Sequence, residues 1–124
     1  MKILAAANNI AMLEDLKKKL SDFSAESEII KESDALMAGK YAFNHKVDIV
    51  FAEAEMKRMN GLQLIEFVRH EHPDVKSFLI GSEKELSESF LDISEDVTGV
   101  LPYPFAENAI EDALQKSGQH IPQR

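Results

Sequence analysis

Short apolar runs alternate with longer segments of helical period along the whole chain of 124 residues. The runs at 2–6, 26–30, 47–52, 77–80 and 98–101 have the length of strands, and the run at 47–52 is continuous enough for burial on both faces. Helical period occupies 10–23, 33–43, 61–70, 84–91 and 106–116. Each pair of parallel strands needs a connection long enough to hold a helix. The alternation therefore predicts an α/β fold, a doubly wound (βα)5 three-layer sandwich around a five-stranded parallel sheet.

The length of 124 residues fits one domain. We expect that domain to occupy 1–116, because 117–124 has no periodicity and resembles a frayed tail or the start of a linker. The chain contains no cysteine, which excludes a disulfide framework, a thiolate metal site and a cysteine nucleophile. The apolar runs are far shorter than the ~20 residues that cross a bilayer, and the first run is too short for a secretory leader. We therefore expect a cytoplasmic protein without a membrane segment.

The charge balance is acidic, with 14 Lys and Arg residues against 22 Asp and Glu residues and a net charge of −8. The one basic cluster is Lys17 to Lys19, so the sequence disfavours direct binding of nucleic acid. Segment 83–96 holds six acidic residues and one lysine, and it alone contributes −5. A charge run of this kind is usually a solvated face, and it would also attract a basic partner surface.

Ligand and reaction sites of doubly wound sheets lie beyond the carboxyl ends of the strands. The positions to consider are therefore 7–9, 52–55, 81–83 and 102–105. Several short motifs lie within or beside the expected third, fourth and fifth strands: Val47-Asp48-Ile49-Val50-Phe51, Met59-Asn60-Gly61-Leu62, Pro73-Asp74-Val75 before the fourth strand, Gly99-Val100-Leu101 and Pro104-Phe105. In their spacing, residues 2–116 resemble the receiver domain of two-component response regulators. The resemblance implies a flavodoxin-like sheet of order 2-1-3-4-5 and a role in phosphorelay signalling.

A working receiver phosphorylates an Asp at the end of its third strand, beside Mg²⁺ held by an acidic pair after the first strand. A Thr or Ser after the fourth strand and a Lys after the fifth complete that pocket, because phosphoryl transfer depends on positioning and on neutralising charge. The matching positions here hold Ala7 and Asn8, Glu53, Gly81 and Tyr103. None of the five has the family's residue type, although Ser82 follows Gly81 and offers a hydroxyl. The resemblance therefore implies a degenerate pseudo-receiver: no enzyme, no catalytic residue, and no metal or cofactor.

Alternatives remain open at two positions. Glu53 either imitates a phosphorylated acid or is a loop carboxylate in a decayed pocket, and Tyr103 either fills that pocket or lies on the surface. The family usually has a cis peptide where Tyr103 meets Pro104, so we expect a cis bond there. Two other functions also remain: an unconventional receiver phosphorylated on Glu53 or Ser82, and a flavodoxin-like domain that binds a small molecule in an open apolar cavity beside Glu53.

The expected mode of action is protein–protein contact. The resemblance implies a signalling protein or a fused output domain as the partner, or a second copy of the chain in a homodimer. The family generally meets partners on the face made by the fourth helix, fifth strand and fifth helix. The candidates on that face are Glu83, Glu85, Glu88, Val100 and Tyr103, with Val100 in place of the family's aromatic switch residue.

Overall fold

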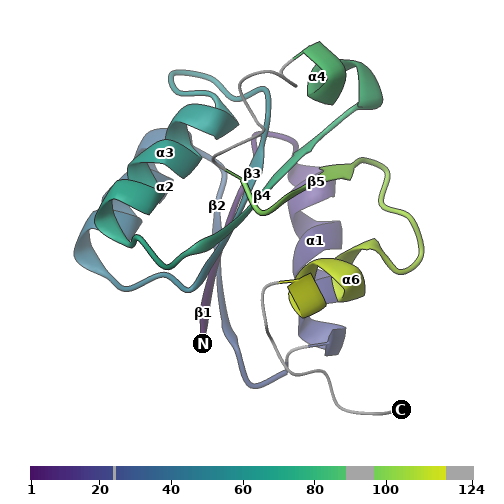
Figure 1. Cartoon of the computed structure of the whole chain (residues 1–124), viewed down its shortest axis with the longest axis horizontal. Helices are drawn as coiled ribbons and strands as arrows, with labels where there is room; N and C mark the ends of the chain where they lie inside the picture. Colours follow the sequence, from purple (N-terminus) through teal and green to yellow (C-terminus); the bar gives the residue numbers. More distant parts are fainter. Residues whose placement is uncertain (24, 89–96, 117–124) are drawn as a thin grey trace.

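Five parallel strands form the centre of the molecule. A computed structural model of the chain describes residues 1–23, 25–88 and 97–116 (Figure 1). The strands are β1 (Lys2–Ala6), β2 (Glu28–Glu32), β3 (Ile49–Glu53), β4 (Lys76–Gly81) and β5 (Gly99–Pro102). Their order in the sheet is β2-β1-β3-β4-β5, and every pair is parallel. The predicted fold class and strand order are confirmed.

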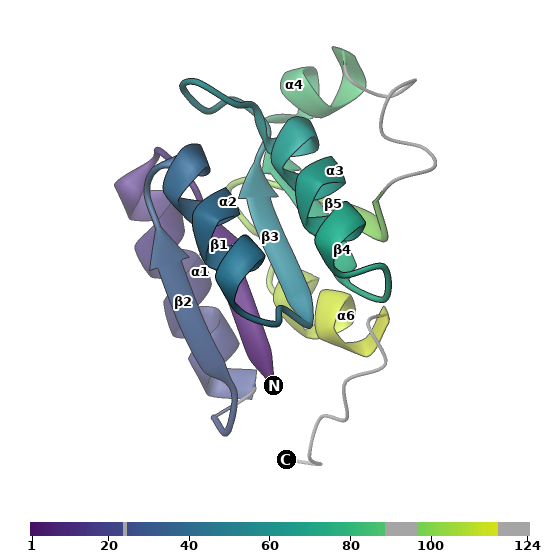
Figure 2. The ribbon, with the colours of Figure 1, turned by 90° about the vertical axis from the view of Figure 1, so that its left-hand side faces the viewer.

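Helices cover both faces of the sheet. They are α1 (Ile10–Phe23), α2 (Ala35–Asn44), α3 (Gly61–Glu71), α4 (Glu83–Glu88) and α6 (Ala109–Lys116). Buried residues of α1 and α6 pack against one face, and buried residues of α2 and α3 pack against the other (Figure 2). None of the helices in the described residues combines the length and the hydropathy needed to span a membrane.

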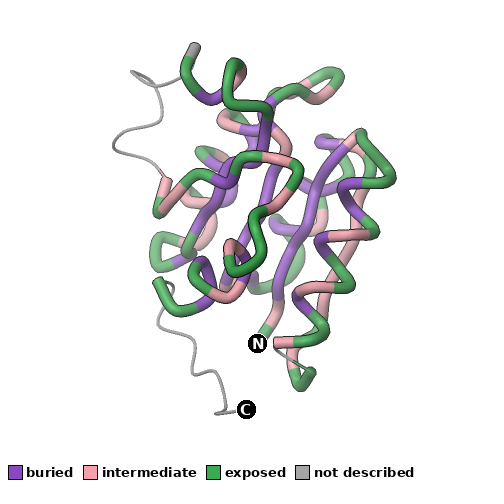
Figure 3. Tube along the Cα trace, turned by 90° about the vertical axis from the view of Figure 1, so that its right-hand side faces the viewer, coloured by how far each residue is buried: buried purple, intermediate pink, exposed green. Residues whose placement is uncertain are grey.

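The core is divided between two layers by the pleat of the strands. Ile3, Ile49 and Phe51 point into the layer under α1 and α6, whereas Leu4 and Val50 point into the layer under α2 and α3. All of these side chains are at most 1% exposed, and the strands lie inside the molecule with exposed positions around them (Figure 3). Burial on both faces explains why the strand sequences are continuously apolar rather than alternating.

Some predicted boundaries are wrong by two or three residues. The last helix begins at Ala109, because the chain first makes a turn in which the Ala109 amide donates to the Ala106 carbonyl over 3.1 Å. Strand β2 begins at Glu28, two residues later than its apolar run suggested. Ile10, expected on the buried face of the first helix, is 56% exposed. The expected helix segment 89–91 and the tail 117–124 lie outside the described residues.

Glycine is required at the start of α3. Asn60 and Gln63 form a reciprocal capping box at the first turn of the helix, and the Gly61 amide donates to the Ala54 carbonyl, just after β3, over 3.1 Å. The backbone approach is so close that a Cβ on Gly61 would lie 2.2 Å from the Glu53 carbonyl oxygen. The Met-Asn-Gly-Leu motif thus serves to bring the α3 N-terminus against the strand end that carries Glu53.

We predict that Gly61→Ala lowers the free energy of unfolding by roughly 2 kcal/mol or more, because backbone atoms of Glu53 must move. Gly39→Ala is the matched control, since its added Cβ would meet only side-chain atoms at 3.7 Å or more. That substitution should leave the free energy unchanged or raise it by up to about 1 kcal/mol through helix propensity. Urea denaturation followed by circular dichroism measures both, and equal stabilities of the two variants would contradict the prediction.

Candidate functional site

The candidate residues of the degenerate pocket meet at one edge of the sheet. In the strand register, Ala6 pairs with Ala52, Glu53 with Ile80, and Gly81 with Pro102. The residues at and just beyond these strand ends therefore stand in a row across neighbouring strands, about 4.8 Å apart per strand. The structure thus brings Asn8, Glu53, Gly81, Ser82 and Tyr103 to the same edge, as the topology predicted.

The carboxylate of Glu53 caps α1. Its Oε1 accepts a hydrogen bond from the Asn9 amide over 3.0 Å, while Asn9 Oδ1 accepts from the Met12 amide over 3.1 Å. Asn9 is the N-cap residue and Met12 the third helical residue, so the two bonds reproduce a capping box. The carboxylate comes from β3 instead of from the helix itself. A negative charge is favourable at this end of a helix.

Asn8 connects two further loops through its side-chain amide. Its Nδ2 donates to the Ser33 carbonyl over 2.6 Å, and its Oδ1 accepts from the Lys57 amide over 2.6 Å. The partners fix the orientation of the amide, because a flipped amide would set oxygen against oxygen and N–H against N–H. One neutral side chain thus joins the loop after β1 to the loops after β2 and β3.

This donor set does not suit Mg²⁺. Magnesium requires near-octahedral oxygen ligands, usually with one or two carboxylates. Ala7 is buried and offers no side-chain ligand, the Asn8 oxygen is bonded to the Lys57 amide, and one Glu53 oxygen is bonded to the Asn9 amide. In the described part of the chain, no three His, Asp or Glu residues lie close enough to hold a metal ion.

Ser82 and Glu85 form the capping box of α4. The Glu85 amide donates to the Ser82 hydroxyl over 3.1 Å, and the Ser82 amide donates to Glu85 Oε1 over 2.8 Å. The Ser-x-x-Glu pattern is the usual sequence signature of this motif, yet the sequence prediction began the helix one residue late, at 84. Gly81 lies directly beneath, where a Cβ would meet Glu85 Oε1 at 3.2 Å and the Ala54 Cβ at 3.3 Å.

Tyr103 packs against the core rather than lying free on the surface. The half-buried ring joins the cluster under α1 and α6 and makes an edge-on contact with Phe105, with centroids 5.0 Å apart at 81°. Its amide donates to the Gly81 carbonyl over 2.9 Å, and the Tyr103–Pro104 bond is cis. The structure shows no hydrogen bond between the Tyr103 hydroxyl and Glu53, two residues that it describes fully.

The expected partner face combines α4, β5 and α6, and its candidate residues come from α4, from β5 and from the position just after β5. Leu86 is buried and fastens α4 to the sheet, while Glu83 is exposed and Val100 is 43% exposed. The carboxylate of Glu85 is held in the capping box, so it contributes charge to this face from a fixed position. The side chain of Glu88 lies outside what the structure describes.

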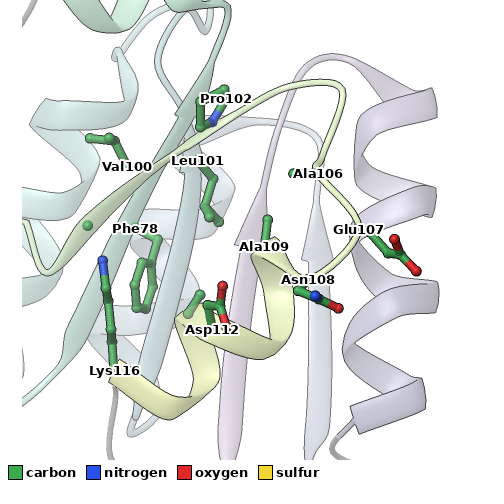
Figure 4. Close-up of a pocket in the computed structure, with 12 residues that line it drawn as sticks. Phe78, Val100, Leu101, Pro102, Ala106, Glu107, Asn108, Ala109, Asp112 and Lys116 are labelled. Atoms are coloured by element: carbon green, nitrogen blue, oxygen red, sulfur yellow. The ribbon is translucent and has the colours of Figure 1, made fainter.

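Two pockets bear on the small-molecule alternative, and neither is an apolar cavity beside Glu53. One of about 440 Å³ lies between β5 and α6, where Leu101, Ala109 and Lys116 are among the lining residues (Figure 4). The other, of about 300 Å³, lies beside Asn8 and has a largely polar lining that includes Arg58.

The fold is that of receiver domains. No protein-family model and no curated protein sequence matches the chain. The chemotaxis response regulator CheY4 of Vibrio cholerae is similar, with a TM-score of 0.80 and 21% identity over 94% of this chain and 97% of CheY4. The receiver domain of NtrX from Brucella abortus is similar with a TM-score of 0.81 and 18% identity, over 93% of this chain and 96% of that domain. The signal receiver domain of an HD domain-containing protein from Pseudomonas fluorescens is similar with a TM-score of 0.78 and 19% identity, over 94% of this chain and 85% of that domain.

We predict that Glu53→Ala lowers the free energy of unfolding by about 1 kcal/mol, because the Asn9 amide loses its partner. Glu53→Gln should cost less, since its side-chain oxygen still accepts the bond. Glu55→Ala is the control, because Glu55 is exposed in the same loop and should stay within about 0.5 kcal/mol of the natural protein. Urea denaturation measures the free energy of unfolding of the three variants. A Glu53→Ala variant as stable as Glu55→Ala would show that Glu53 does not stabilise α1 by capping it.

Proposed function

We propose that this chain is an atypical receiver domain that acts in signal transduction through protein–protein contact, without phosphorylation of an Asp. The observation that carries the proposal is the use made of the two polar side chains at the phosphorylation edge. Glu53 caps α1 and Asn8 joins two loops, so hydrogen bonds occupy the groups that would otherwise gather a metal and a phosphoryl group. The proposal is that the chain keeps the receiver fold and lacks the side chains that would hold Mg²⁺ and a phosphoryl group.

The cation position supports the same proposal. A receiver needs a Lys after its fifth strand to neutralise the phosphoryl oxygens, and here Tyr103 occupies that position with its ring packed on the core. Loss of the metal ligands and the cation together removes several powers of ten in rate. The chain is accordingly proposed to be a binding module and not an enzyme.

The partner is proposed to be a signalling protein or a fused output domain. One similar structure is the receiver domain of an HD domain-containing protein, and another match covers only 27% of the NtrX chain from Brucella abortus. These neighbours support the idea that a domain of this kind works beside a second domain. The exposed Glu83 and Val100 on α4 and β5 are the proposed contact residues.

The lack of phosphorylation is tested with the full chain, a small-molecule phosphodonor and Mg²⁺, followed by intact mass measurement. We expect no phosphoryl increment, and no change in the amide resonances of residues 7–9 and 53–58 at millimolar Mg²⁺. A receiver domain with the complete acidic set and lysine, treated in parallel, shows that the donor is active. A phosphoryl increment that disappears in Glu53→Gln or in Ser82→Ala would instead establish an unconventional receiver.

The partner face is tested by reversing one charge that has no capping role. We predict that Glu83→Lys lowers recovery of the partner from the source cell roughly fivefold, because a basic partner surface is then repelled. Glu66→Lys on α3 is the control, since it makes the same charge change at an exposed position of another face. Reversal at Glu85 is avoided because it would break the Ser82 capping box. Equal recovery with Glu83→Lys and Glu66→Lys would remove the assigned role of this face.

A further inference from the structure

Helix α2 carries three large apolar side chains on the solvent side, while Tyr41 is partly buried against the core. The residues that it buries are all small, namely Ala35, Ala38, Gly39 and Ala42. Leu36, Met37 and Phe43 are 45%, 49% and 65% exposed. A surface helix normally places its large apolar residues against the core and polar residues outside. In α2 three large apolar side chains lie outside instead, and folding of the domain alone does not explain this outer surface.

The small buried face of α2 is matched to α3. Gly39 lies so near that helix that an added Cβ would meet the Phe67 ring and a Leu64 methyl group at 3.7–3.8 Å. His72, at the end of α3, also approaches the Ala42 carbonyl through Nε2 at 2.7 Å. The inner face of α2 is thus packed, and the outer face is directed away from the sheet (Figure 2).

The exposed residues form a stripe along the helix. At about 100° per residue, Leu36 and Phe43 lie nearly in line two turns apart, with Lys40 between them and Met37 beside them. We call Leu36, Met37, Lys40 and Phe43 the α2 stripe. Its pattern is apolar, cationic, apolar, and Lys40 itself is exposed. Exposed apolar surface concentrated in this way marks an interaction site.

The pocket beside Asn8 lies at the N-cap residue of α2, Asp34. The pocket of about 300 Å³ is lined by Ile10, Asp34, Lys57 and Arg58, among others. Asp34 caps α2 and pairs with Arg58 at 3.4 Å. In this pocket lining, Ile10 is an apolar side chain that is 56% exposed. Lys57 and Arg58 are two cations beside the single carboxylate of Asp34. The N-cap end of α2 is therefore bordered by a mainly polar pocket with more cations than carboxylates in its lining.

A second copy of the chain is a poor partner for the α2 stripe. In a two-fold pair of antiparallel α2 helices, Leu36 of one copy would oppose Phe43 of the other, and both Lys40 ammonium groups would meet near the axis. Like charges facing one another oppose such a pair. A membrane surface is also disfavoured, because anionic headgroups repel a chain of net charge −8.

We propose that the α2 stripe docks an amphipathic helix of a partner protein that carries a carboxylate between its apolar side chains. Leu36, Met37 and Phe43 supply an apolar contact surface for the apolar face of the partner helix, and Lys40 selects the carboxylate by charge. The four residues of the α2 stripe are far fewer than the roughly 20 to 30 residues a side of a standard stable interface, so the contact is transient. It lies on a different face from α4 and β5, and it stands whether or not the domain is phosphorylated.

The test uses the full chain labelled with ¹⁵N and a pair of capped helical peptides. Both peptides carry Leu at positions i, i+3 and i+7, and position i+4 is Glu in one and Lys in the other. We expect the Glu peptide to shift the amide resonances of 34–44 and to bind about fivefold more tightly than the Lys peptide. Phe43→Ser should weaken the binding of both peptides roughly tenfold, and Lys40→Glu should reverse the preference.

Val100→Ser is the matched control, because it replaces an exposed apolar residue on β5 and should leave binding unchanged. Melting temperatures confirm that all variants fold. The proposal fails if the shifts fall outside α2, if the two peptides bind equally, or if Lys40→Glu leaves the preference unchanged. It also fails if Phe43→Ser abolishes self-association in sedimentation, or binding to vesicles of phosphatidylcholine and phosphatidylglycerol, since those results assign the stripe to a second copy or to a membrane.

Discussion

The hydrogen bond from the Asn9 amide to Glu53 determines how the Glu53 carboxylate is used at the end of the sheet where the parallel strands terminate. Parallel topology delivers every βα loop to this edge, and each loop brings backbone groups that need partners. Here a carboxylate from β3 caps α1 and the Asn8 amide bonds the two neighbouring loops, so protein groups alone hold the loops together. These bonds give the loop amides protein partners, and the Glu53 carboxylate stabilises the first turn of α1.

The two outer surfaces of the domain differ in chemistry because different elements make them. Helix α4 begins with acidic residues over a buried Leu86, whereas α2 presents apolar side chains around Lys40. Neither surface is required by the core, which is filled by the strands and by the inner faces of α1, α2, α3 and α6. A partner that recognised the acidic surface by charge would therefore find a different chemistry on α2.

The sequence predicts the fold well because its strongest signals are local. Continuous apolar runs such as Ile49 to Ala52 identify buried strands, and their carboxyl ends locate the candidate residues without knowledge of any contact. The partner of Glu53 could not be predicted, since Asn9 is 44 residues away and the contact depends on how β1 and β3 pair. Periodicity also misplaced Ile10, because it reports which residues are apolar and not which side a short packed helix turns inward. The Ser82 capping box, in contrast, was visible in the sequence.

The end of β5 also limits how the sheet can grow. Amide directions alternate along a strand, and the Tyr103 amide points inward to Gly81, so the nitrogen of Pro102 faces outward. Proline has no hydrogen to donate there, and an incoming strand from another molecule would find a gap in the ladder it needs. Pro102 thus makes the end of the β5 border a poor template for adding a strand, which is one of the ways in which proteins protect edge strands.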